Sequence, residues 1–142
     1  MELGDLPFEI RWPATRALTF WRRGDLAEAN AQLDVAARAV TELAHEFGRV
    51  HVLHLRACVA FAEGDVERSR ALHSEVLTLC HELDFLGGMG SALCDLAIID
   101  LTVGDIDAAV VHYERGLACY EEGGYEEDAA KARDMWARAA AS

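Results

Sequence analysis

The chain has 142 residues, 52% of them hydrophobic and 27% charged, a composition that predicts a folded domain rather than a disordered segment. Its formal net charge of −12 argues against a surface for nucleic acid or for an anionic membrane, because both attract basic patches. No uninterrupted apolar run reaches the roughly 18 residues of a membrane span, and the N-terminus lacks the pattern of a signal peptide. We therefore expect one cytoplasmic domain, 1–142, with neither a membrane nor a nucleic-acid partner.

The first dozen residues contain large apolar side chains around Pro7. Their rough alternation predicts an N-terminal arm over 1–12, either extended or formed by the end of an earlier helix. Pro13 suits the first turn of a helix, where its missing amide hydrogen costs little. The sequence therefore predicts that the first long helix begins at Pro13.

A Gly-Asp dipeptide recurs three times at a spacing of forty residues, at Gly24-Asp25, Gly64-Asp65 and Gly104-Asp105. Each follows one apolar helical pattern and precedes another. Glycine can end a helix in the left-handed conformation, and aspartate can cap the start of the next. The spacing predicts three helical hairpins, over 13–48, 49–88 and 89–124.

The ends of the hairpins are predicted at three further glycines, Gly48, Gly88 and Gly124. Because Gly124 comes four residues early, the third hairpin is predicted to be shortened by about one turn. A last helix over 125–142 has an apolar stripe under a charged face. This pattern is typical of a capping helix that closes a stack of repeats.

Aligning the segments on their Gly-Asp turns reveals columns of similar residues: Ala17, Ala57 and Ala97; Leu26, Val66 and Ile106; Ala29, Ser69 and Ala109. The pattern resembles the tetratricopeptide repeat (TPR) family. The period of forty is similar to that of the TPR sensing domains of bacterial transcriptional regulators. The resemblance implies an all-α fold, a right-handed α-solenoid of three hairpins plus a capping helix.

The resemblance also implies a concave binding face lined by the first helix of each hairpin. Carried over position by position, the expected ligand- or partner-binding residues are Leu18, Trp21, Arg22, His51, His54, Arg56, Phe61, Ile98, Asp100 and Leu101. An apolar cleft with a few polar groups suits a peptide or a small molecule. Burial of this face by a second copy, as a homodimer, and burial within the chain's own core are the alternatives.

Two functions follow from this expectation. The first is a non-enzymatic module that binds a peptide, a partner helix or a signal molecule in the concave face. The alternative is a small-molecule-binding or biosynthetic protein with an apolar pocket. That pocket lies either within one chain or at a dimer interface. No motif indicates a catalytic residue or a cofactor.

Several polar residues stand at columns that the TPR family keeps apolar. Arg56 is predicted to pair with Asp95 or Asp100, because a buried charge needs a partner; otherwise these groups hold the polar end of a ligand. A separate group, His51, His54, Cys58 and Cys94, offers zinc-type ligands, but it lacks the short loop spacings of structural zinc sites. We predict no metal there, and four cysteines kept as reduced thiols.

Overall fold

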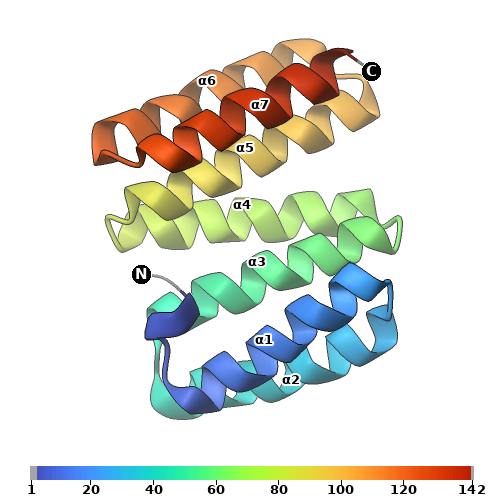
Figure 1. The fold of residues 1–142 in the computed structure, drawn as a ribbon, viewed down its shortest axis with the longest axis vertical. Coiled ribbons are helices and arrows are strands. Elements are labelled where there is room, and N and C mark those ends of the chain that lie inside the picture. Colours follow the sequence, from blue (N-terminus) through green and yellow to red (C-terminus); the bar gives the residue numbers. More distant parts are fainter. Residues whose placement is uncertain (1–2, 142) are drawn as a thin grey trace. The chain divides into compact units, whose positions relative to one another are not determined.

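A computed structural model describes residues 3–141, and within this range the chain consists of helices and turns with no strand (Figure 1). A 3₁₀ turn, η1 (Leu3–Asp5), precedes seven α-helices. These are α1 (Phe8–Arg23), α2 (Leu26–Leu43), α3 (Glu46–Ala62), α4 (Val66–Glu82), α5 (Leu86–Val103), α6 (Ile106–Gly123) and α7 (Glu126–Ala141). The all-α fold predicted from the repeats is confirmed.

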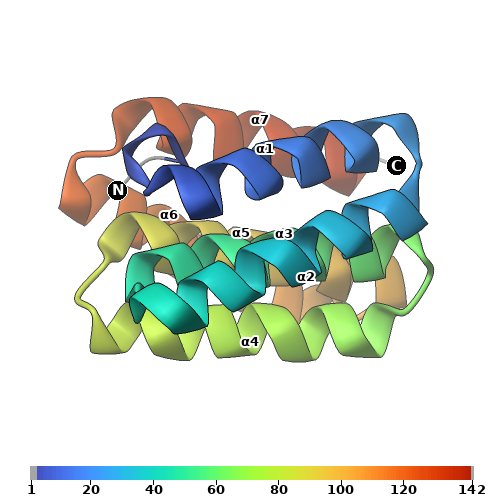
Figure 2. The same ribbon diagram turned by 90° about the horizontal axis from the view of Figure 1, so that it is seen from below.

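The helices form two compact units, the first ending at Leu72 and the second beginning at His73, partway along α4. In the first unit, α1 packs against α2, and α3 packs against both (Figure 2). Its core contains small and aliphatic side chains, including Ile10, Ala17 and Leu33, with 1% or less of their surface exposed. Ser69, fully buried at the start of α4, donates a 2.8 Å hydrogen bond to the carbonyl oxygen of Ala57 on α3.

In the second unit, α5 packs against α6, and α7 contacts both helices. A cluster at the base of α7 joins Tyr120 on α6 to Ala129 and Ala132 on α7. Further along the same contact, the rings of Tyr113 and Trp136 stack with their centroids 4.5 Å apart. The apolar stripe predicted for the last helix therefore covers α6, as expected of a helix that closes a repeat.

Every helix-ending residue with positive φ falls on a period of twenty residues. Gly24, Gly64, Gly104 and Gly124 have φ between 75° and 85°, as predicted for turn glycines. Two residues that are not glycine complete the series, namely Ala44 with φ 48° and Asp84 with φ 52°. Each residue is followed by the N-cap position of the next helix, where Asp65 and Asp105 accept the predicted hydrogen bonds from backbone amides. Asp25 makes no such bond with its side chain.

The prediction that Gly48 and Gly88 close the hairpins is wrong. α2 ends at Leu43 and α4 at Glu82, so both glycines lie inside the following helices. A Cβ at Gly48 would lie 3.0 Å from Ile10 Cδ1, and one at Gly88 would lie 2.4 Å from Cys80 Sγ. These glycines allow helices to approach closely, and Gly124 keeps the period of Ala44 and Asp84, so the third hairpin is not shortened.

The first helix also begins earlier than predicted. α1 starts at Phe8, with Pro7 at its N-cap and Glu9 in its first turn, and Pro13 lies inside it as a buried residue. Residues 8–12 are therefore helical rather than extended. The amide hydrogens of Ile10 and Arg11 both bond the carbonyl oxygen of Pro7, which fixes the first turn.

Helix α5 is the one described helix whose length and composition would allow it to cross a membrane. The central helix of a buried core meets the same criteria. In the second unit α5 lies against both α6 and α7, which accounts for its apolar character. It also carries two carboxylates, Asp95 and Asp100.

Replacing Gly64 with valine tests the turn conformation. Its φ of 84° lies in the left-handed region, where a β-branched side chain is strained, so Gly64→Val should lower the free energy of unfolding by about 1–2 kcal/mol. Because a Cβ at Gly64 meets no atom within 4 Å, the effect isolates backbone strain from steric contact. Urea unfolding followed by circular dichroism measures it, and an unchanged midpoint would contradict the left-handed turn.

Candidate functional site

The first unit holds seven of the ten predicted binding residues, on α1 and α3. Leu18 and Trp21 on α1 are half-buried and pack against the core of the unit, whereas Arg22 is exposed. On α3, His51 and His54 are half-buried, and the ring of Phe61 is 37% exposed. Since α1 and α3 are in contact, these apolar and polar side chains lie on two neighbouring helices of one unit, and they are called here the row of α1 and α3.

Arg56, also on α3, has a different partner from the one predicted. Its Nη2 atom donates a 2.8 Å hydrogen bond to Oδ1 of Asp34 on α2, within the first unit. This bond replaces the expected pairing with Asp95 or Asp100, two acids that belong to the second unit. The arginine side chain is 20% exposed, so the bond neutralises a largely buried charge.

The imidazole of His54 lies near a thiol one helical turn away. Its Nε2 atom is 3.8 Å from Sγ of Cys58, a spacing that follows from their i, i+4 positions on α3. This contact accounts for two of the four side chains considered as zinc ligands. Cys94 lies in the second unit.

In the second unit, α5 supplies the remaining predicted residues. Ile98 and Leu101 are half-buried, whereas Asp100 is only 4% exposed. Its Oδ2 atom lies 2.6 Å from Nδ1 of His112 on α6. The pair links α5 to α6. The Asp100 carboxylate, which the sequence predicts to bind a ligand, therefore contacts His112.

His112 was not anticipated from the sequence. Its column carries Gln32 and Leu72 in the earlier hairpins, so the alignment gave no signal of a functional imidazole. The signal that could have found it is the buried acid itself, because a carboxylate at an apolar column requires a polar partner on the adjacent helix.

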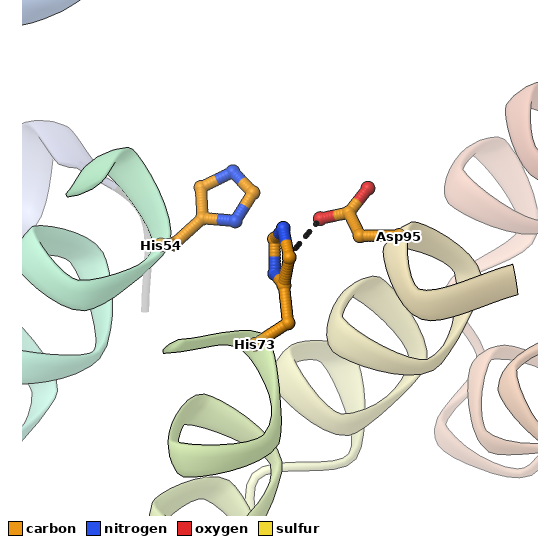
Figure 3. A group of neighbouring side chains, drawn as sticks. All are labelled: His54, His73 and Asp95. Carbon is orange, nitrogen blue, oxygen red and sulfur yellow. Dashed lines mark ion pairs between the residues drawn. The ribbon is translucent and has the colours of Figure 1, made fainter. Parts of the chain in front are cut away.

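A second carboxylate of α5 also faces an imidazole. Oδ2 of Asp95 lies 3.7 Å from Nδ1 of His73 on α4, and the histidine side chain is 4% exposed (Figure 3). An imidazole is unusual at this column, because Leu33 and Tyr113 occupy it in the other hairpins. Asp95 and Asp100 of α5 therefore each lie close to a histidine of a neighbouring helix, on α4 and α6 respectively.

The thiols of the second unit are poor nucleophiles at neutral pH. Burial raises the pKa of Cys94 to about 12, with smaller contributions from Asp95 and Cys119, and burial raises the pKa of Cys80 to about 11. The pKa of Cys119 is also raised, mainly by burial. Because the thiolate is the reactive and metal-binding form, these three cysteines favour packing roles over catalysis.

An open surface pocket of ≈ 340 Å³ lies in the second unit, and none of the predicted binding residues lines it. Side chains of α4, α5 and α6 line it, namely Leu77, Thr78, His81, Glu82, Met89 and Arg115. Its lining combines an acidic, a basic and an imidazole group with the apolar side chains of Leu77 and Met89.

These features define a helical-repeat protein with TPR-like hairpins. The crystal structure of the TPR domain of Arabidopsis FLU is similar to this chain, with a TM-score of 0.71 over 80% of this chain and 96% of that one. The two sequences are 18% identical, so the likeness concerns the fold, and it confirms the TPR-like fold expected from the repeats. No protein-family model and no curated protein sequence matches the chain.

Proposed function

We propose that the chain is a non-enzymatic interaction module that binds a peptide or a partner helix on the row of α1 and α3 in its first unit. The observation that carries the proposal is the column shared by Trp21 and Phe61, one repeat apart on two helices in contact. Both large rings are partly exposed instead of being closed into the core. Aromatic residues that keep exposed surface are the usual anchors of protein interfaces.

The polar residues of the same helices give the row its specificity. Arg22 is exposed near Trp21, and His51 and His54 are half-buried on α3. A few polar groups beside an apolar surface orient a bound segment, because each polar group must find a partner in the complex. The raised thiol pKa values of the second unit support a binding role over a catalytic one.

The double variant Trp21→Ala with Phe61→Ala tests the proposal. Peptides selected from a random library on the parent chain should lose binding to this variant, with circular dichroism showing the helical content retained. If the two rings served mainly as core, each truncation would instead cost roughly 3–5 kcal/mol of stability.

The matched control is Val35→Ala with Leu43→Ala on α2, which removes side chains that are 40% and 47% exposed outside the row. This control should leave binding of the selected peptides unchanged.

Sedimentation of the parent and both variants measures self-association through the same row. Equal binding by the parent and by the Trp21/Phe61 variant would refute the proposed site.

A further inference from the structure

The outer face of α1 carries an exposed stripe, with two aromatic residues, that no helix of the first unit covers. The stripe consists of Phe8, Trp12, Thr15 and Thr19, which follow one another at helical spacing and are all exposed. Phe8 and Trp12 are 61% and 54% exposed, and their rings stack with centroids 6.1 Å apart and planes 15° apart. Large apolar groups exposed together in this way mark an interaction surface.

The repeat shows what normally covers these positions. Forty residues after Phe8 and Trp12 stand Gly48 and Val52 on α3, and both are buried. A Cβ at Gly48 would lie 3.0 Å from Cδ1 of Ile10 on α1 and 3.3 Å from Cγ2 of Val40 on α2, so this face of α3 packs on both helices of the preceding hairpin.

The second unit repeats the arrangement twice. On α5, Ala92 is fully buried, and a Cβ at Gly88 would contact Cys80 of the preceding helix, α4. On α7, Ala132 is 7% exposed and clusters with Tyr120 of the preceding helix, α6. The preceding helix therefore covers the column of Phe8 at Gly48 and Gly88 and the column of Trp12 at Ala132, whereas Asp128, in the column of Phe8 on α7, is exposed.

The charges around the stripe select the chemistry of a partner. On a helical projection, Arg11 and Arg22 flank one edge of the stripe, and Arg16 and Arg23 flank the other. All four arginines are exposed, and Glu9 is the one acid of α1. This basic rim stands out in a chain whose formal net charge is −12.

We propose that the stripe of α1 docks an acidic amphipathic helix of a partner protein, which takes the place of a preceding repeat helix. The partner helix packs small apolar residues on Phe8 and Trp12, because these rings are far larger than the Gly48 and Val52 that face α2. Its carboxylates lie over the arginine rim, where complementary charge speeds association and fixes the register. The rings of this stripe are distinct from Trp21 and Phe61, and Arg22 lies on α1 between the two surfaces.

A synthetic helical peptide serves as the probe, with alanine and leucine on one face, glutamate along both edges of that face, and a fluorescent label. Fluorescence anisotropy with the full chain should show binding that weakens as salt rises. The variants Phe8→Ala with Trp12→Ala and Arg16→Glu with Arg23→Glu should each weaken binding by about tenfold or more. The control variants Val35→Ala with Leu43→Ala and Trp21→Ala with Phe61→Ala should bind as the parent does.

Four outcomes would overturn the proposal. The first is that the acidic peptide does not bind, and the second is that a copy with lysine in place of glutamate binds equally well. The third is that vesicles of phosphatidylcholine and phosphatidylglycerol bind the parent through the stripe while the peptide does not, which would assign the face to a membrane. The fourth is a parent dimer that the Phe8/Trp12 variant makes monomeric, which would assign the face to a second copy.

Discussion

Replacing Gly116 with leucine is expected to unfold the second unit, because α5 and α6 leave no space for a side chain at their crossing. A Cβ at Gly116 would lie 2.8 Å from Sγ of Cys94, 3.0 Å from the carbonyl oxygen of Gly90 and 3.1 Å from the amide nitrogen of Cys94. Two of these three atoms belong to the backbone, so a rotamer change cannot relieve the contact. The helices would have to separate, and the core of the hairpin would open.

The smaller change Gly116→Ala keeps this expectation measurable. Alanine gains about 1 kcal/mol of helix propensity over glycine, yet the contacts with the α5 backbone should produce a net loss of about 1–3 kcal/mol. Urea unfolding followed by circular dichroism measures the change, with Gly4→Ala as the control because a Cβ there meets no atom within 4 Å. An alanine variant as stable as the parent would show that the two helices lie further apart.

The glycines near the helix ends show where sequence reasoning succeeded and where it failed. The three Gly-Asp turns were found because glycine favours the left-handed conformation that ends a helix. The alternate turns were missed because Ala44 and Asp84 adopt that conformation without being glycine. The glycines at 48 and 88 stand four residues after these turns and resemble helix ends in the sequence, although they serve close helix packing instead.

The repeat alignment predicts which residues of the candidate site share a column, but it does not predict which side chains pair with one another. Repeat alignment placed Trp21 and Phe61 in one column of two helices that are in contact. It could not show that Arg56 bonds Asp34 or that Asp100 bonds His112. Such pairs depend on the axial register and rotation of neighbouring helices, which tertiary packing sets rather than the repeat period.

The exposed stripe of α1 was missed for a related reason. An arm over 1–12, as the sequence predicts, leaves Phe8 and Trp12 outside the columns of α3, α5 and α7. Once α1 is known to begin at Phe8, the forty-residue period extends to these residues and identifies the face that a preceding helix would cover.

Deleting residues 126–142 is expected to make the second unit associate or aggregate. The deletion removes Ala129 and Ala132 from Tyr120, and it removes the Trp136 ring that stacks on Tyr113 at 4.5 Å. Two tyrosine rings and the adjacent apolar surface of α6 would then face solvent, and exposed patches of this kind drive association. Size-exclusion chromatography and thermal melting of the truncated chain measure the outcome.

A pair of point variants separates loss of the α7 contact from mere shortening of the chain. Ala132→Glu places a carboxylate at a position that is 7% exposed against α6, and it should cost several kcal/mol because a buried charge without a partner is strongly destabilising. Ala130→Glu places the same charge on the exposed side of the same helix and should change stability by less than about 0.5 kcal/mol. Equal stability of the two variants, or a truncated chain that stays monomeric with an unchanged melting temperature, would show that α7 does not close the repeat. The expected difference between them arises because the helix has only one apolar face, and that face is already occupied by α6.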